Sequence, residues 1–230
     1  MSEINLSNIM PSYEDMLSAG MHYGRRKTVK HPKMDAFIYA LKDSIHLINI
    51  FKTKEELEKA IEFLKKTKES GGVILWTSLT KHSEKKIIEI ADALSMPYVE
   101  ERWLGGTLTN FKTMQKRIKY YKETEEKLAS PEFMEKLTKK KKHDMEKEFR
   151  LLTKKFQGLS RMTKLPDIVF LSSLRHGDLP FREAKRLGIK VVAICNTESD
   201  PHTVDYAIPA NDNAKQSVEL ILETIKKALA

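Results

Sequence analysis

Short apolar runs alternate along this chain with stretches of helical periodicity, and this alternation limits the possible folds most strongly. The clearest runs are 73–78 (VILWTS), 167–173 (DIVFLSS) and 190–196 (KVVAICN), which are rich in β-branched residues and have the length of strands. Between such runs, apolar residues recur at helical spacing. The sequence therefore predicts an α/β fold with a mostly parallel, Rossmann- or flavodoxin-like sheet flanked by helices.

Weaker signals complete the same pattern. We expect further strands at 36–41, 45–50, 97–101 and 205–209, and helices at 53–70, 81–95, 180–188 and 213–230. Within the first of these helices, Thr53 followed by Glu56 has the spacing of a capping box, which predicts that the helix begins there. Gly188 is expected to end the helix before the strand at 190–196.

The alternation stops in one segment, which contains no strand pattern from Thr107 to about Gln157. Two sets of apolar residues recur there in steps of three and four: Phe111, Met114, Ile118, Tyr121 and Leu128, then Met145, Phe149, Leu152, Phe156 and Leu159. Such spacing is typical of a coiled-coil seam, and Ser130-Pro131 suits a turn between two helices. We therefore predict an antiparallel coiled-coil hairpin at 107–164, inserted into an α/β domain formed by 1–106 and 165–230.

The positive charge of the chain is concentrated in this insertion. The whole chain has 41 Lys and Arg and 32 Asp and Glu, a net charge of +9. Residues 112–164 contain 17 of the basic and 8 of the acidic residues, so the rest of the chain holds 24 of each and is neutral. Such a block favours a surface that binds nucleic acid over an anionic membrane, and a solvated helix face of mixed charge is the alternative.

Targeting and membrane signals are weak in this sequence. No apolar run approaches the roughly 20 residues that span a bilayer. The first residues lack the basic and apolar regions of a signal peptide, and the single Cys195 has no partner for an internal disulfide. We expect a cytoplasmic protein without a membrane partner.

Two glycine-containing segments invite a nucleotide-binding interpretation, and both have the wrong spacing. Gly105-Gly106 lies between a strand and a helix but lacks the G-x-G-x-x-G pattern, so we expect a tight backbone joint where the hairpin leaves the domain. Residues 20–28 (GMHYGRRKT) do not have the P-loop spacing. The basic stretch 25–33 (RRKTVKHPK) remains a candidate for contact with a phosphate backbone, with a solvated loop as the alternative.

Catalytic and metal chemistry find little support. Cys195 ends an apolar strand and is expected to be a buried, unreactive thiol, and the histidines lack ligand spacing. Segments 196–202 and 209–213 follow strand ends, where α/β proteins bind ligands, but their residues are also common in turns. We therefore expect no metal site and no catalytic nucleophile among these residues. The rival is a nucleotide-dependent enzyme that uses the strand ends near Ser78, Ser172, Asn196 and Asp200.

Several segments together resemble a known family. In chain order they are AGMHYG, HPKMDAFIYALKDSIHLINIFKT, RWLGGTLTNFKTM, LPDIVFLSS, EAKRLGIKVVAICNTESDP and VDYAIPANDNAKQSVELI. They resemble the bacterial family of small-subunit ribosomal protein S-two over nearly the whole chain. The resemblance implies a structural protein of the cytoplasmic ribosome that binds small-subunit rRNA and neighbouring small-subunit proteins and supports assembly and translation. It also implies no enzyme activity and no required cofactor. In many bacteria this family also helps to recruit the mRNA-binding protein S-one.

The residues that we expect to contact RNA phosphates lie in the stretch at 25–33 and in the hairpin. They are Arg25, Arg26, Lys27, Lys30, Lys33, Lys112, Lys116, Lys139, Lys140, Lys141 and Lys142. Trp103 is expected to anchor the core beside the Gly-Gly joint, with stacking on a base as the alternative. A hairpin that grips protein and not RNA is the second rival function.

Overall fold

Five parallel strands form the central sheet of the molecule. The computed structural model describes residues 9–135 and 137–230. The strands are β4 (Ile74–Thr77), β5 (Tyr98–Val99), β6 (Ile168–Leu171), β7 (Lys190–Cys195) and β8 (Tyr206–Pro209). Their order across the sheet is β5-β4-β6-β7-β8, the doubly wound arrangement of flavodoxin-like folds. This confirms the predicted α/β fold class.

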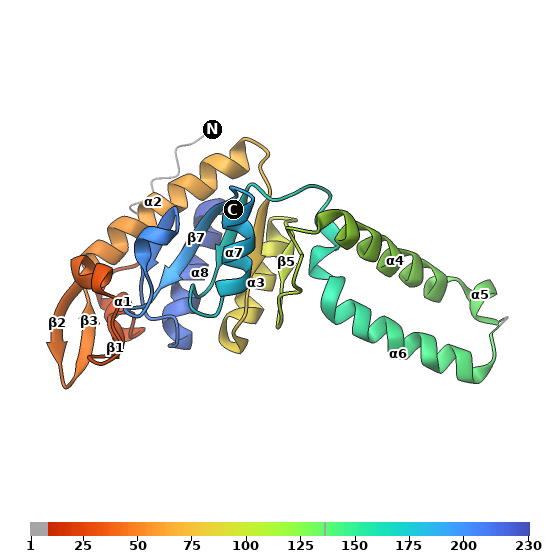
Figure 1. Cartoon of the computed structure of the whole chain (residues 1–230), viewed down its shortest axis with the longest axis horizontal. Helices are drawn as coiled ribbons and strands as arrows, with labels where there is room; N and C mark the ends of the chain where they lie inside the picture. Colours follow the sequence, from red (N-terminus) through yellow and green to blue (C-terminus); the bar gives the residue numbers. More distant parts are fainter. Residues whose placement is uncertain (1–8, 136) are drawn as a thin grey trace.

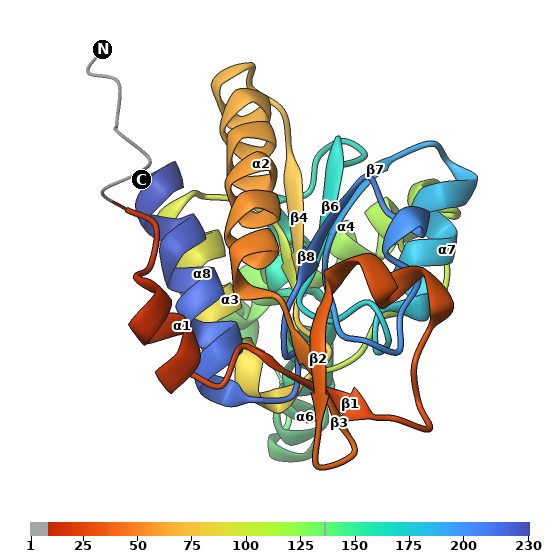
Figure 2. The same ribbon diagram turned by 90° about the vertical axis from the view of Figure 1, so that its left-hand side faces the viewer.

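Both faces of this sheet are buried, and alternate residues of each strand face opposite ways. Ile74, Trp76, Phe170 and Ile194 belong to one apolar cluster, together with side chains of α2 (Ile50–Glu69), α3 (Lys81–Ala93) and α8 (Lys215–Leu229). Figure 2 shows these three helices on the same side of the sheet. Burial on both faces explains why the strands read as continuous apolar runs.

The opposite face of the sheet packs against one helix of the α/β domain and against the base of the hairpin. Leu75, Val169 and Ala193 pack in a second cluster with α7 (Asp178–Arg186) and with the base of the inserted hairpin. Met114 and Phe156 contribute to this cluster from the two arms of the hairpin. The insertion therefore supplies part of a layer that a helix of the α/β domain would otherwise supply.

Beyond its base the hairpin projects away from the sheet (Figure 1). It consists of α4 (Phe111–Ala129), the short α5 (Pro131–Glu135), α6 (Lys139–Phe156) and a 3-10 turn, η3 (Gly158–Arg161). The arms run antiparallel, and the rings of Tyr121 and Phe149 stack with centroids 5.6 Å apart and an interplanar angle of 3°. The predicted seam is buried near the base and only half-buried towards the tip, at Leu128 and Met145.

A second, smaller sheet corrects part of the sequence-based assignment. Three antiparallel strands, in the order β1-β3-β2, lie outside the parallel sheet (Figure 2). The elements of this region are α1 (Tyr13–Ser18), β1 (Tyr23–Arg26), η2 (Pro32–Phe37), β2 (Ile38–Lys42) and β3 (Ile45–Ile48), and η4 (Pro201–Thr203) lies beside η2. The first two residues of the basic stretch 25–33, which was expected to be loop-like, belong to strand β1. Its backbone pairs with β3 over a distance in sequence that periodicity does not reveal.

The predicted start of the first long helix is also wrong. α2 begins at Ile50, and its N-cap is Asn49, whose side chain accepts hydrogen bonds from the backbone N–H groups of Phe51 and Lys52. Thr53 is buried inside the helix and donates to the carbonyl oxygens of Asn49 and Pro209. Its hydroxyl ties α2 to β8, so the capping-box spacing with Glu56 was accidental.

Candidate nucleic-acid interface

The hairpin presents one group of the predicted phosphate contacts to solvent. Lys112 and Lys116 are exposed on the first turns of α4. Lys139 to Lys142 form the first turn of α6, at the far end of the hairpin, where Lys142 is half-buried and the other three are exposed. Among residues 9–135 and 137–230, no carboxylate lies within 4.0 Å of any of these six ammonium groups. Their charge is therefore not neutralised by a close contact in that part of the chain.

The predicted contacts near the small sheet have a different environment. Lys30 pairs with Asp35, and Lys33 pairs with Asp200 at 2.7 Å. The hydrogen bond from Lys33 is the main cause that lowers the pKa of Asp200. Arg26 and Lys27 are exposed, and the described residues bring no carboxylate within 4.0 Å of either. Within this group the structure thus separates paired from unpaired cations.

Arg25 is the most constrained member of the set. Its Nε donates to Oε1 of Glu198 at 3.0 Å, and its Nη2 lies 2.8 Å from the same oxygen and 3.7 Å from Oδ1 of Asp212. Its backbone N–H donates to the hydroxyl of Thr197 at 2.8 Å. Arg25 therefore fastens β1 to the loop that follows β7, and its contact with RNA remains a prediction.

The lysines at the tip of the hairpin, Lys139 to Lys142, and the predicted contacts near the small sheet lie at opposite ends of the molecule, while Lys112 and Lys116 lie near the base of the hairpin. Figure 1 shows the small sheet at one end and the tip of the hairpin at the other, with the parallel sheet between them. The structure does not bring them together into one patch. An RNA that met both would have to extend along the whole long axis of the protein.

The loop at Gly105-Gly106 binds a carboxylate group of the protein itself. Glu183, on α7, is buried, and its Oε1 accepts from Nε1 of Trp103 at 3.0 Å and from the backbone N–H of Gly106 at 2.8 Å. Its Oε2 accepts from the backbone N–H groups of Leu108 and Thr109 and from the Thr109 hydroxyl. The loop thus resembles a phosphate cradle that an internal carboxylate fills.

This arrangement sets the ionisation of Glu183. Burial alone would raise the pKa of the carboxyl group, but the hydrogen bonds from Trp103, Gly106, Leu108 and Thr109 outweigh burial and lower its pKa. The prediction of a tight joint is consistent with Gly106, whose φ of +87° favours glycine. Trp103 is buried and directed at Glu183, as a core anchor would be.

Side chains also fill the crevice at which doubly wound sheets bind ligands. β4 and β6 are neighbours at the point where the strand order reverses, and Ser78 and Ser172 follow their carboxyl ends. Both hydroxyls bond to that of Ser83, at 2.6 Å and 3.1 Å. One strand further, Asp212 accepts from Ser173 at 2.6 Å and from Asn196 at 2.8 Å. These buried polar groups satisfy one another.

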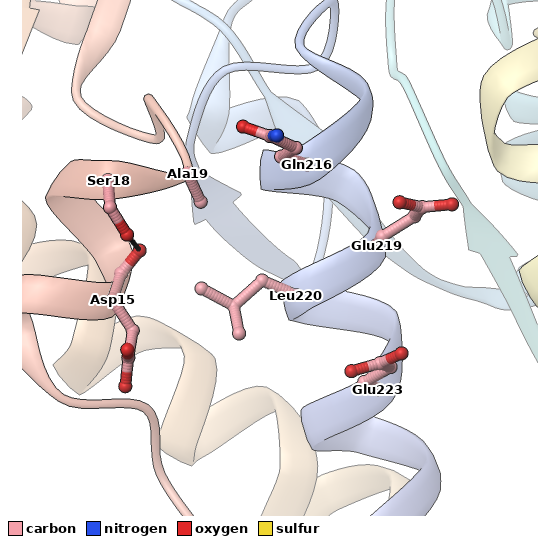
Figure 3. Close-up of a pocket in the computed structure, with 7 residues that line it drawn as sticks. All are labelled: Asp15, Ser18, Ala19, Gln216, Glu219, Leu220 and Glu223. Atoms are coloured by element: carbon pink, nitrogen blue, oxygen red, sulfur yellow. Dashed lines mark hydrogen bonds between the residues drawn. The ribbon is translucent and has the colours of Figure 1, made fainter.

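Other surface features do not suit an RNA phosphate. A groove of about 420 Å³ between α1 and α8 is lined by Asp15, Glu219 and Glu223 and by no basic side chain, so it offers an RNA phosphate no cationic partner in its lining (Figure 3).

Cys195 is fully buried, and burial raises the pKa of its thiol. Across the described ranges, no group of three or more His, Cys, Asp or Glu side chains is arranged to hold a metal ion. No helix in the described part of the chain is long and apolar enough to cross a membrane.

Sequence reasoning missed two clusters that the fold assembles. Glu183 lies 74 to 80 residues from its partners, and no local pattern marks it. Arg175 and His176, after β6, lie beside Arg25 and Arg26 from β1, and Glu198 lies beneath them. The Arg-His pair that begins two residues after the end of the predicted strand 167–173 was a signal that could have drawn attention to this second cluster.

Comparison with known proteins agrees with these observations. Residues 16–230 match the family described as "Ribosomal protein S2". The chain is 40% identical over 216 residues to "Small ribosomal subunit protein uS2" of Bifidobacterium longum subsp. infantis, covering 94% of this chain and 77% of the relative. Proteins of the same name in Coprothermobacter proteolyticus and Thermus thermophilus are each 39% identical over 218 and 212 residues, covering 94% and 91% of this chain and 80% and 81% of the relatives.

The fold is a flavodoxin-like α/β scaffold with an exposed basic hairpin, and its own side chains fill the usual ligand crevice. The chain belongs to the ribosomal protein S2 family. It is therefore a structural component of the small subunit of the cytoplasmic ribosome, associated with rRNA and other ribosomal proteins, and not an enzyme.

Proposed function

We propose that this protein binds small-subunit rRNA directly, through the hairpin at one end and the basic loop of the small sheet at the other. The α/β domain supplies a surface that fits the folded rRNA, and the basic side chains of the hairpin and of the stretch 25–33 contact its phosphates. Contacts to phosphates position a protein on RNA but carry little base information. Specificity then comes from the shape of the folded rRNA and from neighbouring ribosomal proteins.

One observation carries the proposal. The chain's excess of positive charge lies in the hairpin, and the six lysines predicted there as phosphate contacts have no carboxylate within 4.0 Å among the described residues. A solvated helix face of mixed charge would place acidic partners beside most of its lysines at helical spacing. Lys119 with Glu123 and Arg150 with Glu146 form such pairs. Asp144 and Glu146 also stand at helical spacing from lysines 140–142, but they form no pair within 4.0 Å with them.

The test is the salt dependence of rRNA binding. Replacing Lys139, Lys140, Lys141 and Lys142 with Ala should weaken binding and flatten the plot of log affinity against log salt, because fewer counterions are released. The matched control replaces four exposed lysines of the body helices, Lys66, Lys85, Lys215 and Lys227. Equal slopes of log affinity against log salt for the two fourfold variants would show that Lys139 to Lys142 do not contact RNA phosphates.

The wider role is tested in the cell extract. Comigration of the tagged protein with small subunits on a sucrose gradient, lost after RNase digestion, is expected if rRNA holds it in place. Comigration that survives RNase would favour a hairpin that grips protein.

Recruitment of S-one is a further part of the proposal, and it rests on the family resemblance. Small subunits depleted of this chain should retain less S-one than complete ones. Equal S-one content would remove that role.

A nucleotide-dependent enzyme is the remaining rival. The mutual hydrogen bonds of Ser78, Ser83 and Ser172 argue against it, since a ligand would have to break them. A rise in the melting temperature (Tm) of the protein with millimolar ATP or GTP would revive this possibility.

A further inference from the structure

We infer that a pocket at the carboxyl edge of the parallel sheet binds one phosphate group of the RNA backbone. The pocket has a volume of about 510 Å³. Its lining consists of Arg25, Arg26, Val29, Arg175, His176, Glu198 and Asn213. The inference rests on the proposed rRNA binding and adds to it a specific subsite, with Arg175 and His176 as new members.

The fold brings these residues together from four separate segments. Arg175 and His176 follow β6, Glu198 follows β7 and Asn213 follows β8, so all three loops lie at the edge where doubly wound sheets bind ligands. Arg25 and Arg26 arrive from β1 of the small sheet. The serine crevice between β4 and β6 is filled, but the same edge stays open further along.

Gly24 allows this approach of the small sheet. A Cβ atom at Gly24 would lie 2.5 Å from Cγ2 of Thr197 and 2.9 Å from the carbonyl oxygen of His46. The backbone of β1 can therefore lie directly against the loop after β7 only because residue 24 has no side chain. The hydrogen bond from the Arg25 N–H to Thr197 then fixes where both arginines emerge.

Glu198 organises the pocket without cancelling its charge. Its side chain is only 6% exposed, and it accepts from Arg25 through Oε1 and from Arg175 through Oε2. Each guanidinium group has five N–H donors in one plane, and the shared carboxylate takes only part of them. The two arginines are thus held in place before any ligand arrives, which reduces the entropy that binding would cost.

The charges in the pocket favour a phosphate. The three guanidinium groups outnumber the acidic groups in contact with them, even when the buried Asp212 is counted with Glu198. Planar forks of N–H donors match the oxygens of a phosphate better than ammonium groups do. α8 begins two residues after Asn213, so the positive end of its dipole lies near the same pocket.

The experiment compares two double variants that remove equal charge. The pocket variant is Arg26→Ala with Arg175→Ala, and the control is Arg182→Ala with Arg186→Ala, two exposed arginines of α7 that do not line the pocket. Glu198 keeps Arg25 as its partner in the pocket variant, so the fold should persist, and thermal unfolding checks this. If the alanine pair unfolds early, Arg26→Gln with Arg175→Gln takes its place.

Binding of each protein to small-subunit rRNA is measured over a series of salt concentrations. We expect the pocket variant to bind about tenfold more weakly at fixed salt, with a salt slope reduced by about one. The control should bind within about twofold of the parent protein. If the two variants bind alike, the pocket is not a phosphate site, although the proposed rRNA binding stands; if the parent does not bind rRNA, the proposed function itself fails.

Two further probes identify the source of the phosphate. Inorganic phosphate and ATP at equal ionic strength should leave the Tm unchanged, since a single ion lacks the neighbouring contacts of a polymer. Stabilisation by either of them that the pocket variant loses would reassign the pocket to a free phosphate compound. Competition by polyglutamate as strong as that by RNA would overturn the preference for phosphate.

Discussion

Replacing Glu183 with Gln tests how much the buried carboxylate contributes to the fold. Five donors converge on its two oxygens, namely Trp103 Nε1, the backbone N–H groups of Gly106, Leu108 and Thr109, and the Thr109 hydroxyl. A glutamine keeps the shape but replaces one oxygen with an NH2 group. Whichever way the amide turns, at least two donors then face another donor.

The expected cost follows from this count. A hydrogen bond to a charged group contributes about 1.5 to 3 kcal/mol. The loss of two such bonds, partly compensated by relaxation of the loop, should lower the free energy of unfolding by about 3 kcal/mol. For a chain of this length, 1 kcal/mol shifts the Tm by about 2 to 4 °C, so Glu183→Gln should lower it by about 6 to 12 °C.

Thermal unfolding followed by circular dichroism at pH 7.5 measures this shift, with Glu62→Gln, on the exposed side of α2, as the control. The folded-state pKa of Glu183 is lowered, so its stabilisation is full above the ordinary carboxyl pKa and is lost as the pH falls through the lowered value. The gap between parent and variant should therefore stay constant from pH 8 to about pH 5 and close only in more acidic solution. A shift below 2 °C at pH 7.5 would refute the structural role of the carboxylate.

Three other predictions follow from particular contacts. Gly24→Ala should lower the Tm by several degrees and speed hydrogen exchange in the small sheet, because its Cβ would overlap Thr197; protection equal to the parent's would show that the loop yields easily. Replacing residues 123–147 with a short Gly-Ser turn should leave cooperative melting of the body, since the Tyr121–Phe149 stack and the base of the hairpin remain, and a broad, non-cooperative melt would contradict an independent body. Cys195 should react with a thiol reagent only as fast as the chain unfolds, so rapid labelling of the native protein would disprove its burial.

The parallel sheet and its helices could be predicted because their signals are local. Strands buried on both faces are continuous apolar runs, and helices with one buried face repeat their apolar residues. Glycines at positive φ, such as Gly71 and Gly188, mark helix ends for the same local reason. The tight joint at Gly105-Gly106 was also predictable, from the glycines and from the break in the pattern that follows them.

The small sheet and the arginine pocket could not be predicted, because they depend on contacts between distant segments. β1 is a strand because it pairs with β3 and docks on the loop after β7. The helix start at Asn49 was missed for a related reason: the Thr53 hydroxyl, which appeared free to cap, is engaged by Pro209 in another strand. Charge counting found the exposed lysines of the hairpin but could not show that Arg25 shares a carboxylate with Arg175.

The packing of the base of the hairpin against the sheet connects the fold to its proposed role. A long arm that carries cations is useful for docking only if its direction relative to the body is fixed. Met114 and Ile118 of α4 and Phe156 of α6 pack in the same cluster as Val169 of the sheet, which fixes the base of the arm. Glu183 holds the loop through which the chain enters the arm. Glu183, which occupies the loop that resembles a phosphate-binding loop, thus helps to fix the orientation of the hairpin. The hairpin in turn carries the lysines that, on our proposal, contact RNA phosphates.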